Sequence, residues 1–132
     1  MRVFKKPRAT PEHNDQVAFF RWAAWNLKAY PELAVMYAIA NGGHRHIRVA
    51  MNLKAEGVKA GVPDIALPVP RGKYAALYIE MKAGKNTTTP EQDEWLARLN
   101  ALGNLAIVCH GWTEAAEAVK NYLELGSNEK EK

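Results

Sequence analysis

The chain has 132 residues, the length of one domain that buries about two-thirds of its unfolded surface. Its 18 Lys and Arg residues against 14 Asp and Glu residues give a net charge of +4, which permits an anionic partner such as nucleic acid without requiring one. Its one cysteine, Cys109, excludes an internal disulfide bond, and no apolar run suits a signal peptide or a membrane span, so we expect a soluble cytoplasmic protein.

A helix is predicted over residues 11–29. Thr10 provides a hydroxyl for the N-cap, and Pro11 stands at the first helical position. Apolar residues then recur at spacings of three and four: Val17, Phe20, Ala24 and Leu27. This spacing predicts an amphipathic helix that ends before Pro31.

The next segments predict a strand and a short helix. Residues 33–40 are rich in apolar and β-forming residues and stop at a glycine turn, which favours a strand. Residues 45–56 favour a short helix. The side chains expected to face the core there are Ile47, Met51 and Leu53.

The second half of the chain begins with a predicted β-hairpin, whose strands cover residues 64–69 and 74–82. Thr89 then caps a helix that ends near Gly103, and residues 105–109 form a short buried strand. Thr113 is expected to cap a last helix to about residue 125. Residues 1–126 thus form one domain with a mixed sheet and helices on its faces, followed by a flexible charged tail, 127–132.

Charged residues stand in the predicted hairpin where apolar residues are expected. If the turn is centred on Gly72, Asp64 lies opposite Glu80, with Cβ atoms about 5 Å apart. Two carboxylates at that distance repel each other unless a positive charge lies between them. Two acids and the backbone carbonyl of Met81 would suit a hard divalent ion such as Mg²⁺.

Lys82 shares the strand face of Glu80 and projects toward the same point. A metal ion there would polarise a phosphodiester and lower the pKa of a water molecule, while the lysine would offset the charge that develops on attack. The alternative is structural: Asp64 and Glu80 would be ordinary charges at strand ends, with Lys82 as their salt-bridge partner.

The joint pattern resembles a known nuclease family. Pro63-Asp64, a hairpin and then Glu80-Met81-Lys82 spell the PD-(D/E)xK nuclease motif. With the flanking segments 57–64 and 89–96, the chain resembles the virus-type replication-repair nuclease (VRR-NUC) domain from Glu12 to about Tyr122. The resemblance implies a restriction-endonuclease-like α/β fold and a stand-alone, Mg²⁺- or Mn²⁺-dependent DNA endonuclease.

The resemblance also implies roles for individual residues. Asp64 and Glu80 would hold the metal, Lys82 would assist the attack, and Gln92 and Glu12 would support the site from two helices. Gln92 has a competing structural role, because Thr89-x-x-Gln92 fits a capping box. Glu12 is also favoured by the helix dipole whatever its function.

Family analogy and the basic residues suggest the substrate. Small stand-alone members resemble Holliday-junction resolvases, which implies branched DNA, a homodimer and a bacterial or phage-infected host cell. The alternatives are a monomeric nuclease for flaps or duplex ends, and a DNA-binding module without catalysis. The candidate phosphate contacts are Arg45, Arg48, Lys54, Lys59 and Lys85.

Overall fold

The computed structural model describes residues 10–40 and 47–126, with the side chains of residues 47–50 excluded. The strands form one sheet in the order β1-β2-β3-β4, in which β1-β2 and β2-β3 are antiparallel and β3-β4 is parallel. The strands are β1 (Tyr37–Ala38), β2 (Ile65–Leu67), β3 (Leu77–Lys82) and β4 (Leu105–His110). The helices are α1 (Pro11–Trp25), α2 (Ile47–Ala55), α3 (Pro90–Ala101) and α4 (Trp112–Leu123), with a 3₁₀ helix, η1 (Pro31–Val35), after α1.

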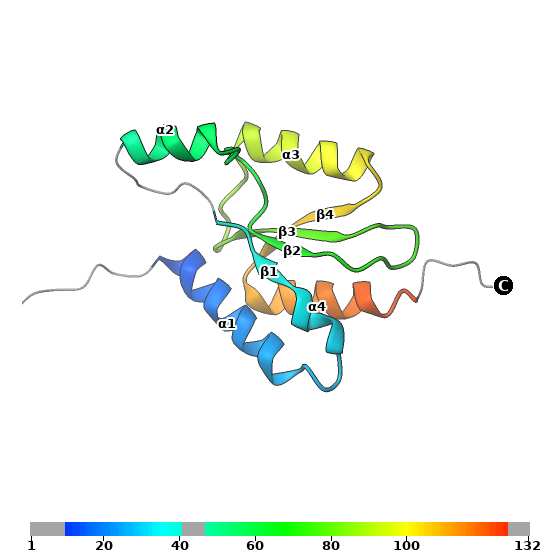
Figure 1. Cartoon of the computed structure of the whole chain (residues 1–132). Coiled ribbons are helices and arrows are strands. Elements are labelled where there is room, and N and C mark those ends of the chain that lie inside the picture. Colours follow the sequence, from blue (N-terminus) through cyan, green and yellow to red (C-terminus); the bar gives the residue numbers. More distant parts are fainter. Residues whose placement is uncertain (1–9, 41–46, 127–132) are drawn as a thin grey trace, which may run out of the picture.

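The helices cover both faces of the sheet, so the predicted α/β class is confirmed. α1 and α4 pack together under one face, and α3 lies over the other (Figure 1). Strand β3 is therefore nearly buried on both faces, including its charged residues Glu80 and Lys82. No helix in the described part of the chain has both the length and the apolar character needed to cross a bilayer.

The hydrophobic core fills the space between β2, β3 and the pair α1 and α4. Phe19 of α1 and Val119 of α4 are fully buried there against Ile79 of β3. Tyr122 is also buried, and its hydroxyl donates a hydrogen bond to the carbonyl of Val69 at 2.6 Å. This bond satisfies a polar group that would otherwise be costly to bury.

Helix α1 differs from its prediction in length and in its buried face. It ends at Trp25 and continues as a turn, and its buried residues are Phe19 and Ala23. Val17 and Leu27, which were expected in the core, are each 41% exposed. The spacing of the apolar residues fitted two helix faces, and packing against α4 selected the face one position away.

Three further expectations require correction. Residues 33–40 are not one strand, because η1 covers Pro31–Val35 and only Tyr37–Ala38 pairs with β2. Helix α2 occupies the predicted place, but Met51 is 63% exposed. Helix α4 starts at Trp112 with Gly111 as its N-cap, so Thr113 lies inside the helix.

Two glycines near β2 offer a matched test of close packing. Both have positive φ, which strains any L-residue, but a Cβ on Gly61 would lie 2.8 Å from the backbone of Glu91, whereas a Cβ on Gly57 would meet nothing within 4 Å. We expect Gly57→Ala to destabilise the fold by about 1 kcal/mol and Gly61→Ala by about 3 kcal/mol or more. Urea unfolding of the two variants measures the difference, and equal losses would show that the Gly61 contact relaxes at no cost.

Candidate active site

The hairpin brings the two predicted carboxylates together. Ile65 pairs with Ile79, so the residues next to this pair, Asp64 and Glu80, face each other across the strands. This is the register expected from a turn centred on Gly72. The backbone N–H of Asp64 donates to the carbonyl of Ile79 at 3.0 Å, which extends the pairing to Asp64.

Asp64 is held from both neighbouring strands. Its Oδ2 accepts a hydrogen bond from the N–H of Met81 at 2.8 Å, and its carbonyl accepts one from the N–H of Ile39 at 2.7 Å. These bonds fix the carboxylate at the start of β2, beside the backbone of β3. Its orientation is therefore set before any ligand arrives.

Glu80 is buried at the same point, with 3% of its surface exposed. Its Oε2 accepts a hydrogen bond from Gln92 Nε2 at 3.0 Å and lies 3.9 Å from Lys82 Nζ. Its Oε1 has no hydrogen-bond donor within the described residues. A buried carboxylate oxygen without a donor is costly, so this atom calls for a proton or a cation.

The acidic pair binds a proton more tightly than free carboxyl groups do. Burial, and then the charge of Asp64, raise the pKa of Glu80 from 4.5 to about 8, although Lys82 acts in the opposite direction. Burial also raises the pKa of Asp64, against the hydrogen bond from Met81. Near neutral pH the pair is therefore expected to hold a proton.

The donor set fits a hard cation such as Mg²⁺ or Mn²⁺. Asp64 and Glu80 offer carboxylate oxygens, including Glu80 Oε1, which accepts no hydrogen bond from the described residues. In the described part of the chain, no three His, Cys, Asp or Glu side chains gather closely enough to hold a metal by themselves. Other ligands would therefore be backbone carbonyls, substrate oxygens or water, as Mg²⁺ sites commonly use.

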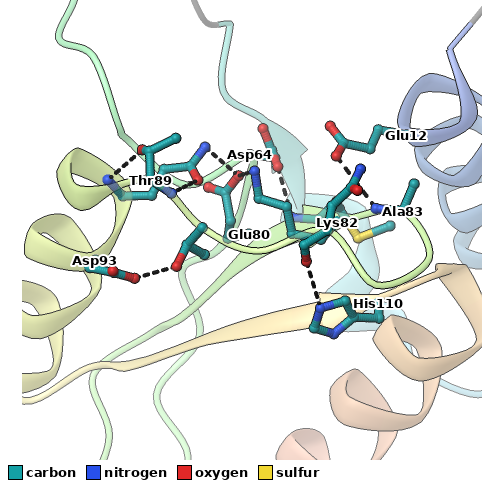
Figure 2. A network of polar contacts seen from close by, with 12 residues as sticks. Glu12, Asp64, Glu80, Lys82, Ala83, Thr89, Asp93 and His110 are labelled. Carbon is teal, nitrogen blue, oxygen red and sulfur yellow. Dashed lines mark hydrogen bonds and ion pairs between the residues drawn. The ribbon is translucent and has the colours of Figure 1, made fainter.

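Lys82 ends β3 as a buried cation, 9% exposed. Figure 2 shows it gathered with Glu12, Asp64 and Glu80 at this end of the strand. Because its ammonium group lies 3.9 Å from Glu80 Oε2, it partly neutralises the acidic pair. The salt-bridge contact of the structural alternative is thus present, and it places a positive charge next to the acidic pair.

Gln92 makes both contacts that the sequence left open. Its Oε1 accepts a hydrogen bond from the N–H of Thr89 at 2.9 Å, and Thr89 Oγ1 accepts one from the N–H of Gln92 at 3.2 Å, which completes the capping box. Its Nε2 donates to Glu80 (Figure 2). The two ends of one amide thus join the start of α3 to the acidic pair.

Glu12 reaches the site from the first turn of α1. Its Oε2 accepts a long hydrogen bond, 3.4 Å, from the N–H of Ala83, directly after β3. Its negative charge raises the pKa of both Asp64 and Glu80. The structure therefore brings all five predicted residues together, from the starts of α1, β2 and α3 and from the end of β3.

The predicted phosphate contacts are spread more widely. Lys85 is exposed in the loop after β3. The ring Nε2 of His110 contacts the same loop, at 3.1 Å from the carbonyl oxygen of Asn86. Lys59 lines a hollow of about 390 Å³ with Trp95 of α3, and Lys54 is exposed near the end of α2. Arg45 and the side chain of Arg48 lie outside the described residues.

A cleft beside the site was not predicted from the sequence. Gln16 and Phe20 line it with Glu12, at spacings of four along α1, and Asp64 closes it from the sheet. The same spacing, read from Glu12 onward, would have identified this helix face. Phe20 fits the core-facing spacing of α1 equally well, so the sequence does not distinguish a core residue from a cleft residue at this position.

Comparisons with known proteins agree with this geometry. A family model for the VRR-NUC domain matches residues 9–113. Among solved structures, the chain is similar to a protein described as "VRR_NUC domain protein", with a TM-score of 0.78 and 27% sequence identity, over 93% of this chain and 96% of that one. A comparison with curated proteins gave no match.

Proposed function

The chain belongs to the VRR-NUC domain family, a family of nuclease domains, and we propose from this premise that it is a divalent-metal-dependent endonuclease for branched DNA. The observation that carries the proposal is the pair Asp64 and Glu80, opposed on neighbouring strands, with the buried Glu80 Oε1 lacking a donor among the described residues. An acidic pair of this kind is costly unless a cation is part of its function.

The chain's residues have separate tasks in the proposed reaction. Asp64 and Glu80 would hold Mg²⁺ or Mn²⁺, with the Met81 carbonyl as a further proposed ligand. When bound, the ion supplies Lewis-acid stabilisation and a water molecule of lowered pKa. Lys82 offsets the charge that develops on the phosphate, and Gln92 keeps Glu80 oriented through its 3.0 Å hydrogen bond.

The fold also favours a phosphate at this place. Helices α1 and α3 both start beside the site, where they contribute Glu12 and Gln92. Helix N-termini carry partial positive charge, which attracts anions. The DNA backbone is thus drawn toward the carboxyl end of β3, while Lys54, Lys59 and Lys85 are proposed to bind phosphates farther from the cut.

The first test compares substrates and metals. Purified protein and Asp64→Ala are incubated with labelled four-way junction, flap and linear duplex DNA, in Mg²⁺, Mn²⁺ or EDTA. We expect metal-dependent symmetric cuts in the junction by the unmodified protein alone. Cuts confined to flaps or ends would favour the alternative of a monomeric flap or duplex-end nuclease. Binding without any cleavage would favour a DNA-binding module.

The hypothesis that the protein cleaves four-way junctions also requires a homodimer, because two strands must be cut in a coordinated way. Size-exclusion chromatography with light scattering, at the concentration used for cleavage, measures the oligomeric state. Only monomer, with or without junction DNA, would remove the support for paired cutting. It would leave the proposal of metal-dependent hydrolysis intact.

The double contact of Gln92 predicts different effects at the two ends of its amide. Thr89→Ala removes the N-cap side chain and should lower the free energy of unfolding by about 1 kcal/mol. Gln92→Ala removes the capping amide and also the donor to Glu80, so it should lower both stability and the cleavage rate. Urea unfolding and single-turnover cleavage of the two variants test this, and equal cleavage rates would show that the Glu80 contact has no catalytic effect.

A further inference from the structure

An open cleft of about 680 Å³ lies between α1 and the sheet, where Asp64 at the start of β2 lines it. Its wall on α1 is formed by Glu12, His13, Gln16, Val17 and Phe20. With about 3.6 residues per turn, these positions share one face of the helix. At about 1.5 Å per residue the wall runs about 12 Å from the acidic site along α1.

The wall changes from acidic to polar to apolar along its length. In the described part of the chain, no hydrogen bond joins the side chain of His13 or Gln16 to another residue. The half-buried ring of Phe20 packs edge to face on the buried ring of Phe19, with centroids 5.5 Å apart and an interplanar angle of 78°. The far end of the cleft thus presents an aromatic ring in a fixed orientation, with polar groups beside it.

We propose that this cleft binds one unpaired nucleotide of the DNA strand being cut, next to the scissile phosphate. The base stacks against Phe20, and its hydrogen-bonding edge faces the amide of Gln16. The inference rests on the proposed function and deepens it, because an unpaired nucleotide, as in a flap or at an opened branch point, is a feature that a plain duplex lacks.

The chemistry of the cleft matches a nucleotide. Its volume is in the range of small-molecule sites, about 300–1,000 Å³. Aromatic side chains stack on bases, and glutamine amides form hydrogen bonds with base edges. A paired base has its faces covered by stacking and its edge in use, so only an unpaired or flipped nucleotide can make both contacts.

The test is a double-mutant cycle that combines substitutions in the protein with abasic positions in the DNA. Fluorescence anisotropy measures binding of the whole chain, in Ca²⁺ and in EDTA, to a labelled duplex with an unpaired flap. In a series of otherwise identical substrates, each nucleotide of the flap and of the flap junction is replaced in turn by an abasic residue. We expect one position at which loss of the base weakens binding about tenfold.

The variants show whether that position occupies this cleft. Phe20→Ala and Gln16→Ala should each weaken binding of the intact DNA, but neither should weaken binding further once the sensitive base is absent, because the two changes remove the same contact. Gln16→Ala is the variant that leaves the core untouched. Trp25→Ala, on the same helix and 83% exposed, is the control that should leave the effect of the abasic site unchanged.

Two results would overturn the inference. One is an abasic scan with no sensitive position, and the other is a loss in Gln16→Ala and Phe20→Ala that is the same for intact and abasic DNA. Because binding is measured without hydrolysis, the two proposals can fail separately. If the binding losses of variant and abasic DNA are not additive but the protein does not cleave DNA in Mg²⁺, only the nuclease proposal is overturned. If the protein cleaves DNA but the two binding losses add, only the nucleotide site is overturned.

Discussion

Glu80→Gln is expected to abolish metal-dependent cleavage and at the same time to stabilise the metal-free protein at pH 8. The amide keeps the shape of the side chain and can still accept the hydrogen bond from Gln92. It removes one of the two charges that are proposed to hold the cation, so cleavage should fall by about a thousandfold or more. It also removes the repulsion that makes the ionised pair with Asp64 unfavourable.

The stability change depends on pH in a defined direction. The pKa of Glu80 is raised from 4.5 to about 8 on folding, so between these values the folded chain binds more protons than the unfolded chain. Stability is then fully present below about pH 4.5 and falls as the pH rises through 8. The fall should be a few kcal/mol, at most about 5, and Glu80→Gln should not show this part of it.

Urea unfolding in EDTA from pH 5 to 8 measures this difference. Mg²⁺ should stabilise the unmodified protein more at pH 8 than at pH 5, and should have little effect on Glu80→Gln. Glu94→Gln is the matched control, because Glu94 is exposed and pairs with Arg98 on the surface of α3. If the unmodified protein and Glu80→Gln had the same pH dependence, the buried pair would not hold a proton.

Lys82→Met should lower the single-turnover cleavage rate by about a hundredfold to a thousandfold while DNA binding persists. Methionine preserves the length of the side chain and removes the buried charge 3.9 Å from Glu80. Since Lys82 lowers the pKa of Glu80, its loss should raise that pKa further. The residual activity should therefore have its pH profile shifted to higher pH.

Cleavage rates from pH 6 to 9, with DNA affinity measured in EDTA, separate catalysis from binding. Lys120→Met is the control for a lost lysine charge, because Lys120 is partly exposed on α4 and pairs with Glu117 at 3.8 Å. A Lys82→Met variant that binds DNA weakly but cleaves saturating DNA at the normal rate would contradict the assignment. Lys82 would then be a phosphate contact alone.

Sequence patterns predicted the local features of the site well. The turn at Gly72 and the alternation of side chains along a strand fix which residues oppose each other, so the register of Asp64 and Glu80 followed from the sequence. The capping box of Thr89 and Gln92 also followed, because it depends on residues three apart. Both depend on near neighbours in the chain and have few competing arrangements.

Errors arose where a local pattern allowed two solutions. The apolar residues of α1 fit a face with Val17 as well as one with Phe19, and only contact with α4 decides between them. Residues 33–40 have β-forming side chains, yet Pro31 starts a 3₁₀ turn that leaves two residues for strand β1. Here tertiary packing outweighed intrinsic propensity.

By itself, the sequence determined the element order, the opposed carboxylates and the lysine on the strand of Glu80, because these follow from strand periodicity, turns and caps. Only the tertiary structure decided how deeply Glu80 is buried, and hence that its pKa rises to about 8. It alone joined Glu12 to Ala83, 71 residues away, and opened the cleft along α1. Burial and contacts between distant segments depend on how the helices pack on the sheet, which no local pattern specifies.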